Sequence, residues 1–239
     1  QPKYTPRLLA DPFANKDCTA QAGIPEHRAL ARQAVRESLV LLTSENDVLP
    51  LDPSDTIAVV GEHGDNSGLQ SGGWSIHWQG QTESYRGATT ILGGIQAVAP
   101  HAEYSPAGCY EGMKAQTAVV VVGEQPYAEF EGDTDDLFLT EAHKQLVRDC
   151  KALGKNVVVV LVSGRVLAIA PELELSDAFI AAWLPGSEGA GVADFLFATD
   201  GFKPTGKSPY AWPREVGDLP LTQFDSRALF PFGFGLEEY

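Results

Sequence analysis

Residues 119–139 read VVVVGEQPYAEFEGDTDDLFL, and the character of the chain changes abruptly within this stretch. Val119 to Val122 are consecutive β-branched residues, which is typical of a strand buried on both faces of a parallel sheet. The run ends at Gly123, and a loop rich in carboxylates follows, with Glu124, Glu129, Glu131, Asp133, Asp135 and Asp136. Open α/β sheets bind ligands at the carboxyl ends of their strands, so this loop is a candidate functional site. The alternative is a solvated acidic loop, since runs of charge usually face solvent.

Other segments of the chain repeat this alternation of strand and helix. Apolar runs predict strands at residues 56–61, 157–162 and within AFIAAW, and helical spacing predicts helices at 89–98, 141–153 and about 188–198. Strands that alternate with helices form parallel sheets with helices on both faces. We therefore predict an α/β fold with a mostly parallel sheet of about six strands sandwiched between helices.

The first 45 residues differ from the rest of the chain. Residues 1 to about 25 are irregular, because Pro2, Pro6, Pro12 and Pro25 prevent a continuous helix. From Glu26 to Leu42, apolar residues recur at helical spacing with arginines on the other side, which predicts an amphipathic helix. We expect residues 1–45 to be an interdomain linker and first helix, and residues 46–239 to be an α/β-sandwich domain. This arrangement suggests that another domain precedes the linker.

Composition and charge exclude several classes of partner. The 239 residues are 44% hydrophobic, which is enough to bury a substantial core. They include 32 acidic and 17 basic residues, which gives a net charge of −15. This charge opposes binding to nucleic acid and to anionic membrane surfaces. No apolar run approaches the roughly 18 residues that a membrane-spanning helix needs.

No sequence motif in a fitting context predicts a cofactor or metal site. No GxGxxG follows the first predicted strand. Residues 201–208, GFKPTGKS, have the spacing of a phosphate-binding loop but lie in the proline-rich tail and not between a strand and a helix, so no dinucleotide or nucleotide cofactor is expected. The histidines His63, His77, His101 and His143 lack HExxH spacing, and we interpret them as non-ligands. The cysteines Cys18, Cys109 and Cys150 are far apart and lack CxxC spacing. We expect them to be ordinary thiols, with neither a disulfide nor a zinc site.

A long glycine-rich loop, residues 62–88, contains Trp74 and Trp78. Loops of this length without regular structure are usually functional or disordered. The two tryptophans argue against disorder, because indole rings need a surface to pack against. Either both rings plug the edge of the core, or they form an aromatic platform for a sugar ring or another flat ligand. Carboxylates beside tryptophans are consistent with cleavage of a glycosidic bond.

Several sequence blocks, in one order, resemble the C-terminal α/β-sandwich domain of glycoside hydrolase family 3, in its branch of exo-β-glucanases and β-glucosidases. The blocks are EHRALARQAVRESLVLLTSE, SGGWSIHWQG, GEQPYAEFEGD, VLVSGRVLAI, AAWLPGSEGAGVADFLF and FPFGFGL. The resemblance implies a retaining enzyme in which an N-terminal (β/α)8 barrel, not present in these 239 residues, supplies an aspartate nucleophile. It implies that this chain supplies the glutamate acid/base across a shared cleft and is inactive alone.

The resemblance also implies roles for individual residues. In retaining hydrolysis a carboxylic acid protonates the leaving oxygen while a carboxylate about 5–5.5 Å away attacks the anomeric carbon. The resemblance favours Glu129 as the acid/base, with Glu124 as the alternative, although Glu124 could instead hold the loop by accepting backbone hydrogen bonds. Trp78 matches a family tryptophan that stacks on the sugar beyond the cleavage point, and Trp74 is expected to support it. No metal or cofactor is implied.

The implied substrate is a β-glucan or β-glucoside oligosaccharide, and the implied location is extracellular or periplasmic. Two other functions stay open. One is a non-catalytic carbohydrate-binding domain, which would keep the tryptophans but needs no acid. The other is a flavodoxin-like domain that binds a small ligand.

Overall fold

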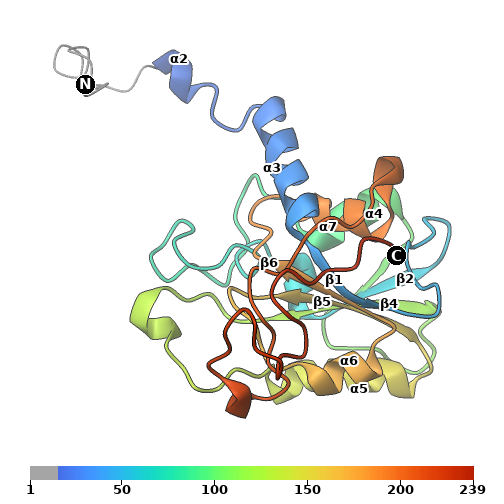
Figure 1. The fold of residues 1–239 in the computed structure, drawn as a ribbon. Coiled ribbons are helices and arrows are strands. Elements are labelled where there is room, and N and C mark those ends of the chain that lie inside the picture. Colours follow the sequence, from blue (N-terminus) through green and yellow to red (C-terminus); the bar gives the residue numbers. More distant parts are fainter. Residues whose placement is uncertain (1–15) are drawn as a thin grey trace.

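The computed structural model describes residues 16–239 and contains one six-stranded sheet with helices on both faces (Figure 1). The strands are β1 (Val40–Ser44), β2 (Ile57–Val60), β3 (Glu103–Ser105), β4 (Thr117–Gly123), β5 (Asn156–Val162) and β6 (Ala178–Trp183). The α-helices are α2 (Lys16–Thr19), α3 (Pro25–Ser38), α4 (Ile91–Val98), α5 (Glu141–Ala152), α6 (Ala170–Leu175) and α7 (Ala190–Leu196). Single turns of 3-10 helix form η1 (Glu62–Asp65), η2 (Glu129–Gly132), η3 (Thr199–Gly201) and η4 (Val216–Asp218).

The strand order across the sheet is β1-β6-β5-β4-β2-β3. β1 runs antiparallel to β6, and every other neighbouring pair is parallel. The predicted α/β fold with a mostly parallel sheet is therefore confirmed. Because the parallel strands point the same way, the loops that leave β2, β4 and β5 meet at one edge of the sheet.

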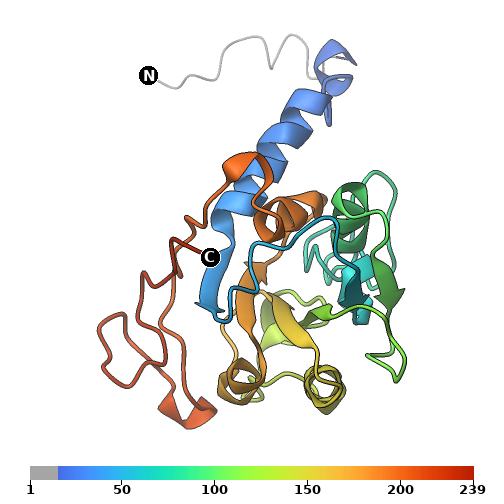
Figure 2. The same ribbon diagram turned by 90° about the vertical axis from the view of Figure 1, so that its right-hand side faces the viewer.

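The valine run of β4 lies in the middle of the sheet and is fully buried. Val119 and Val121 pack in the core beneath α4 and α7, whereas Val120 and Val122 pack in the core on the side of α5. This two-sided burial explains why the strand is apolar at every position instead of alternating. Figure 2 shows the two helical layers, with α5 and α6 on the face opposite α4 and α7.

α3 stands away from the layers, and none of its residues is buried (Figure 1). Its side chains reach the body of the domain through two ion pairs, from Arg28 to the buried Glu188 and from Arg32 to the buried Asp194 of α7. Most of its length is therefore exposed in this chain.

The first predicted helix ends earlier than expected, which is a correction to the sequence analysis. The structure ends α3 at Ser38 and makes Val40–Ser44 the strand β1. Leu41 packs in one core and Val40 and Leu42 in the other, so these consecutive residues are all buried. A strand covered on both faces accommodates such a run, whereas a helix on a sheet buries only one side. The sheet thus begins inside the segment that we assigned to the linker and helix.

The expectation of three ordinary thiols is also wrong. Cys109, in the loop after β3, forms a disulfide with Cys150 in the last turn of α5. The two residues are 41 positions apart, so sequence spacing gave no sign that the fold brings them together. Cys18 is a free, exposed thiol.

Residues after η3 have little regular structure but are anchored to the sheet. Trp212 is fully buried and pairs with Phe230 in an isolated bridge, and the backbone of Leu236 donates to the carbonyl of Leu41 at 2.9 Å. Within residues 16–239, no helix combines the length and the apolar character that crossing a bilayer requires.

Candidate functional site

Loops from three strands meet at the carboxyl edge of the sheet, where the acidic stretch was expected to lie. They are residues 62–88 after β2, residues 124–140 after β4 and the turn at Ser163–Arg165 after β5. The first two project from the body of the domain at the left of Figure 1. The side chains singled out from the sequence, Glu124, Glu129, Trp74 and Trp78, all belong to these two loops.

Glu124 is held at the base of the loop, directly after β4. Its Oε1 lies 2.9 Å from Nε of Arg165, and its Oε2 accepts a hydrogen bond of 3.0 Å from the Tyr127 hydroxyl. The side chain is only 17% exposed. Burial raises the pKa of Glu124, and the charge of Arg165 and the hydrogen bond from Tyr127 offset this only in part. Glu124 is thus a fixed, partly buried carboxylate.

Arg165 connects this carboxylate to the rest of the loop. Its guanidinium lies 4.0 Å from the centre of the Tyr127 ring, donates to the Tyr127 hydroxyl at 2.7 Å, and donates to the carbonyl of Gly132 at 2.7 Å. Burial, together with the neighbouring charge of Glu124, raises the pKa of Tyr127 to about 12. The contacts of Arg165 therefore span the loop from Glu124 to Gly132.

Glu129 lies between these anchors and has a different environment. It is exposed, and it begins the single turn η2 with a φ of 53°. This left-handed conformation is unfavourable for a residue with a Cβ and persists only where neighbouring structure imposes it. The preceding residue, Ala128, is buried and donates its N–H to Oε1 of Gln79 at 2.7 Å. The anchored backbone thus presents the Glu129 side chain to solvent.

The tryptophan loop packs tightly against the acidic loop. A Cβ added at Gly73 would lie 2.1 Å from the carbonyl oxygen of Tyr127, which is much closer than a real contact permits. Only glycine therefore allows this approach of the two backbones. Together with the bond between Gln79 and Ala128, this contact sets the position of the tryptophans relative to Glu129.

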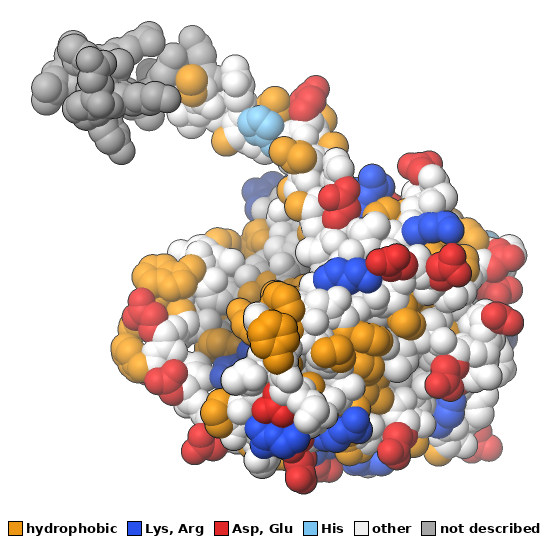
Figure 3. Space-filling model, in the orientation of Figure 1, with side chains coloured by type: hydrophobic (Ala, Val, Ile, Leu, Met, Phe, Trp, Pro, Cys, Tyr) orange, Lys and Arg blue, Asp and Glu red, His pale blue; other side chains and the backbone are white. Residues whose placement is uncertain are grey.

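Trp74, Trp78 and Phe130 form an exposed aromatic cluster across the two loops. The rings of Trp74 and Trp78 are 6.4 Å apart, and those of Trp78 and Phe130 are 5.6 Å apart and nearly perpendicular. Trp74 is 69% exposed, Trp78 42% and Phe130 62%. This exposure rules out the interpretation that both tryptophans plug the edge of the core. Figure 3 shows hydrophobic and acidic side chains next to one another on the projecting loops.

Sequence reasoning missed three residues of this site. Arg165 and Gln79 come from segments distant in sequence from the contacts they make, and an isolated Arg or Gln carries no motif. Phe130 follows Glu129 directly, but its contact with Trp78 depends on how the two loops pack. The signal that could have been used was the position of Arg165 just after the apolar run of β5, at the same edge of the sheet as Glu124.

The chain is similar to known proteins along nearly its whole length. Residues 39–238 match the family described as "Glycosyl hydrolase family 3 C-terminal domain". A periplasmic beta-glucosidase of Salmonella typhimurium is 29% identical over 98% of this chain and 38% of its own length. A lysosomal beta glucosidase of Dictyostelium discoideum is 30% identical over 98% of this chain and 32% of its own length.

The chain also superposes on solved structures of a beta-glucanase and a beta-glucosidase. The exo-1,3/1,4-beta-glucanase from a Pseudoalteromonas species superposes with a TM-score of 0.83 at 41% identity, and the match covers 90% of this chain and 28% of that one. The beta-glucosidase from Listeria innocua in complex with glucose also superposes with a TM-score of 0.83, at 25% identity, over 96% of this chain and 36% of that one. The chain thus spans between a quarter and two fifths of these relatives.

Proposed function

Because the chain belongs to glycoside hydrolase family 3 as its C-terminal domain, we propose that it supplies the general acid/base of a retaining β-glucosidase or exo-β-1,3(1,4)-glucan glucohydrolase. In this proposal a (β/α)8 barrel domain of the same enzyme faces the projecting loops and supplies the aspartate nucleophile. Residues 1–39, which precede the sheet, connect the two domains. The substrate is a β-glucoside or β-glucan oligosaccharide bound in the cleft between them.

The observation that carries the proposal is the contrast between the two glutamates. Both oxygens of the Glu124 carboxylate have partners within the domain, because one pairs with Arg165 and the other accepts a hydrogen bond from Tyr127. Glu129 is exposed, and the ring of the next residue, Phe130, lies 5.6 Å from that of Trp78, so in this proposal a sugar stacked on Trp78 lies near Glu129. The acid/base therefore is Glu129, and Glu124 holds the loop.

In the proposed mechanism Glu129 donates a proton to the leaving oxygen while the aspartate of the barrel attacks the anomeric carbon. A covalent glycosyl-enzyme forms, and Glu129 then takes a proton from the water that hydrolyses it. Trp78 stacks on the leaving sugar, and Trp74 and Phe130 support its ring. The 239-residue chain alone lacks the opposing wall, so we expect no turnover of aryl β-glucosides above that of a mock purification.

The dependence on the leaving group tests the role of Glu129. In the complete enzyme, Glu129→Ala should lower kcat/KM for a disaccharide roughly 100-fold or more, the usual effect of removing a general acid. An aryl glucoside with an activated leaving group should lose far less in this first step, because its aryloxide departs without protonation. Glu131→Ala, in the same exposed turn, is the matched control and should behave as the parent enzyme does.

The same measurement distinguishes acid catalysis by Glu129 from the alternative of a non-catalytic carbohydrate-binding domain. A non-catalytic domain that only binds sugar would make Glu129→Ala and Glu131→Ala equally harmless to both substrates. A loss that is equal for the two leaving groups would also contradict acid catalysis by Glu129. A flavodoxin-like function would instead appear as flavin or another cofactor that copurifies with the chain.

We infer an extracellular or periplasmic location for the enzyme. The disulfide between Cys109 and Cys150 supports it, because such bonds persist in oxidising compartments. The names of the periplasmic and lysosomal relatives agree with a location outside the cytosol. Detection of the intact disulfide in protein isolated from its native source would test this inference.

A further inference from the structure

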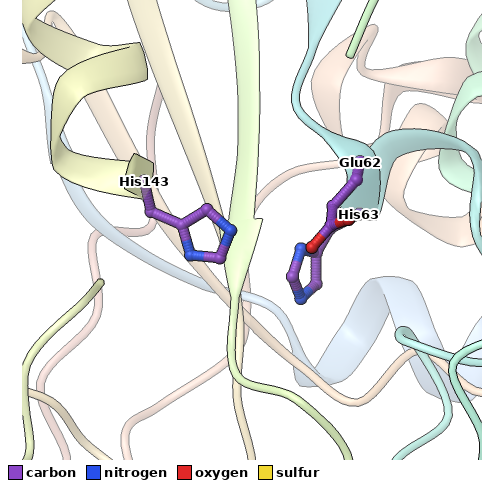
Figure 4. Close-up of side chains that lie close together, drawn as sticks. All are labelled: Glu62, His63 and His143. Atoms are coloured by element: carbon purple, nitrogen blue, oxygen red, sulfur yellow. The ribbon is translucent and has the colours of Figure 1, made fainter. Parts of the chain in front are cut away.

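Two histidines that the sequence analysis interpreted as non-ligands lie together behind the acidic loop. Glu62 and His63 belong to η1, and His143 is in the first turn of α5. Each of the three residues offers one potential ligand atom, and these atoms all lie within 4.8 Å of one another. Figure 4 shows the two imidazole rings near one another at the end of β4, with the Glu62 carboxylate beside His63.

His63 leaves a buried ring nitrogen without a partner. It is fully buried, and its Nε2 lies 3.1 Å from the carbonyl oxygen of Glu124. A carbonyl can only accept a hydrogen bond, so Nε2 is the donor in this contact and Nδ1 is the ring nitrogen that remains available to a metal ion. Within the described part of the chain, this Nδ1 is buried and has no hydrogen-bond partner. Metal-binding histidines usually donate their other ring N–H to a carbonyl or carboxylate in this way.

His143 also leaves a ring nitrogen without a partner. It is 7% exposed, and its Nδ1 is buried without a hydrogen-bond partner among residues 16–239. The ring centres of His63 and His143 are 5.2 Å apart, and the rings are nearly perpendicular. Buried polar atoms in native proteins are normally paired, so two such nitrogens in one cluster require an explanation.

Charge and access at the cluster both favour a cation. Glu62 is exposed and provides negative charge at the edge of the cluster. A pocket of about 430 Å³, lined in part by Glu62, His143 and Asp149, opens from the cluster to solvent. It provides an entry path and room for a water ligand.

We propose that Glu62, His63 and His143 bind one divalent transition-metal ion, with Zn²⁺ as the best match. Two imidazoles and one carboxylate form a ligand set that zinc accepts, with a fourth position left for water. Hard cations such as Ca²⁺ and Mg²⁺ are disfavoured, because they prefer oxygen ligands. The ion would join η1 to α5 beside the end of β4. Because His63 contacts the Glu124 carbonyl, the bound ion would also stiffen the base of the loop that carries Glu129.

Calorimetric titration of the protein with Zn²⁺ tests the site, after chelation with EDTA and removal of the chelator. We expect one Zn²⁺ to bind at about pH 7.5, and Glu62→Gln and His143→Gln each to weaken binding at least about tenfold. His101→Gln is the matched control, since His101 is exposed and lies outside the cluster. Zn²⁺ should also raise the Tm of the parent and of His101→Gln, and this rise should be smaller in Glu62→Gln.

Three results would overturn the proposal. The first is the absence of stoichiometric binding by the parent protein. The second is unchanged affinity in Glu62→Gln, which is decisive because an exposed side chain can be replaced by its isostere without unfolding the chain. The third is an equal loss of affinity in His101→Gln, which would place the bound ion elsewhere. Thermal unfolding in the presence of chelator verifies that each variant is folded. If His143→Gln does not fold, the zinc affinity of Glu62→Gln alone decides the test.

Discussion

Nε of Arg165 lies 2.9 Å from Oε1 of Glu124, and the same guanidinium donates to the carbonyl of Gly132 eight residues further along the chain. One side chain after β5 therefore holds both ends of residues 124–132, the part of the loop that contains Glu129. The geometry depends on a planar group, because Arg165 also stacks on the Tyr127 ring at 4.0 Å. Lysine carries the same charge but cannot reproduce these contacts together.

Replacing this arginine should loosen the loop. We expect Arg165→Lys to lower the free energy of unfolding by about 1–3 kcal/mol, because Glu124 and the Gly132 carbonyl lose buried hydrogen bonds. Arg148→Lys on the outer face of α5, where Arg148 is 41% exposed, should change it by less than about 0.5 kcal/mol. Urea denaturation monitored by circular dichroism measures both variants. Equal stabilities would show that the Arg165 contacts do not hold the loop.

The disulfide leads to a second stability prediction. Cys109→Ser/Cys150→Ser should destabilise the chain by about 2–4 kcal/mol, because the unfolded chain is no longer constrained by a closed loop. Cys18→Ser should be neutral, since Cys18 is exposed and unpaired with another cysteine. Urea titration in the absence of reductant gives the comparison. If the double variant were as stable as Cys18→Ser, the bond would contribute nothing to folding.

A third prediction concerns acid stability. Asp177 accepts hydrogen bonds from the backbone of Val157 at 2.8 Å, from Lys151 at 2.9 Å and from Asn46 at 3.0 Å. Burial alone would raise the pKa of Asp177, but these bonds outweigh it and lower the pKa below its ordinary value of 3.8. The stabilisation is therefore present above pH 3.8 and is lost as the pH falls through the folded-state value.

We expect Asp177→Asn to lower the free energy of unfolding by about 1–3 kcal/mol at about pH 7. This difference between the variant and the parent should shrink below about pH 4. Denaturant titrations from about pH 7 to about pH 3 follow the effect. Asp55→Asn serves as the control, because Asp55 is exposed. A difference that stays constant over this range would contradict the account.

The aromatic cluster can be tested in the complete enzyme. Trp78→Ala should weaken the binding of a longer β-glucan oligomer more than the binding of a disaccharide, because ring stacking contributes on the order of 1 kcal/mol beyond the effect of buried area. Phe224→Ala is a suitable control, because Phe224 is 86% exposed and lies in the C-terminal segment. KM and kcat for both substrates give the answer. Equal kinetics of Trp78→Ala and the parent would leave Trp78 without a role in binding.

Local patterns in the sequence predicted the parts of the fold that depend on local residues. The four valines of β4 are buried on both faces, as an uninterrupted β-branched run indicates, and α4 and α5 lie within the segments 89–98 and 141–153 where helical spacing predicted helices. The N-terminal helix was extended too far, because LVLL satisfies helical spacing as well as a buried strand. Only the pairing of Val40–Ser44 with β6 decides between the two.

The candidate site could be predicted only in part. The glutamates and tryptophans were identified because they stand in recognisable blocks. The disulfide, Arg165 and the pair of His63 with His143 were not, because each depends on segments that meet only after folding. The different surroundings of Glu124 and Glu129 likewise depend on Arg165, which no spacing along the chain connects to them.

The most direct test of the central proposal is rescue by azide in the complete enzyme, with an activated aryl glucoside as substrate. Glu129→Ala should form the glycosyl-enzyme but hydrolyse it slowly, because no base activates water. Azide needs no base, so it should restore turnover and yield a β-glycosyl azide, whereas Glu124→Ala should show no rescue. Rescue of Glu124→Ala but not of Glu129→Ala would contradict the account and assign the acid/base to Glu124.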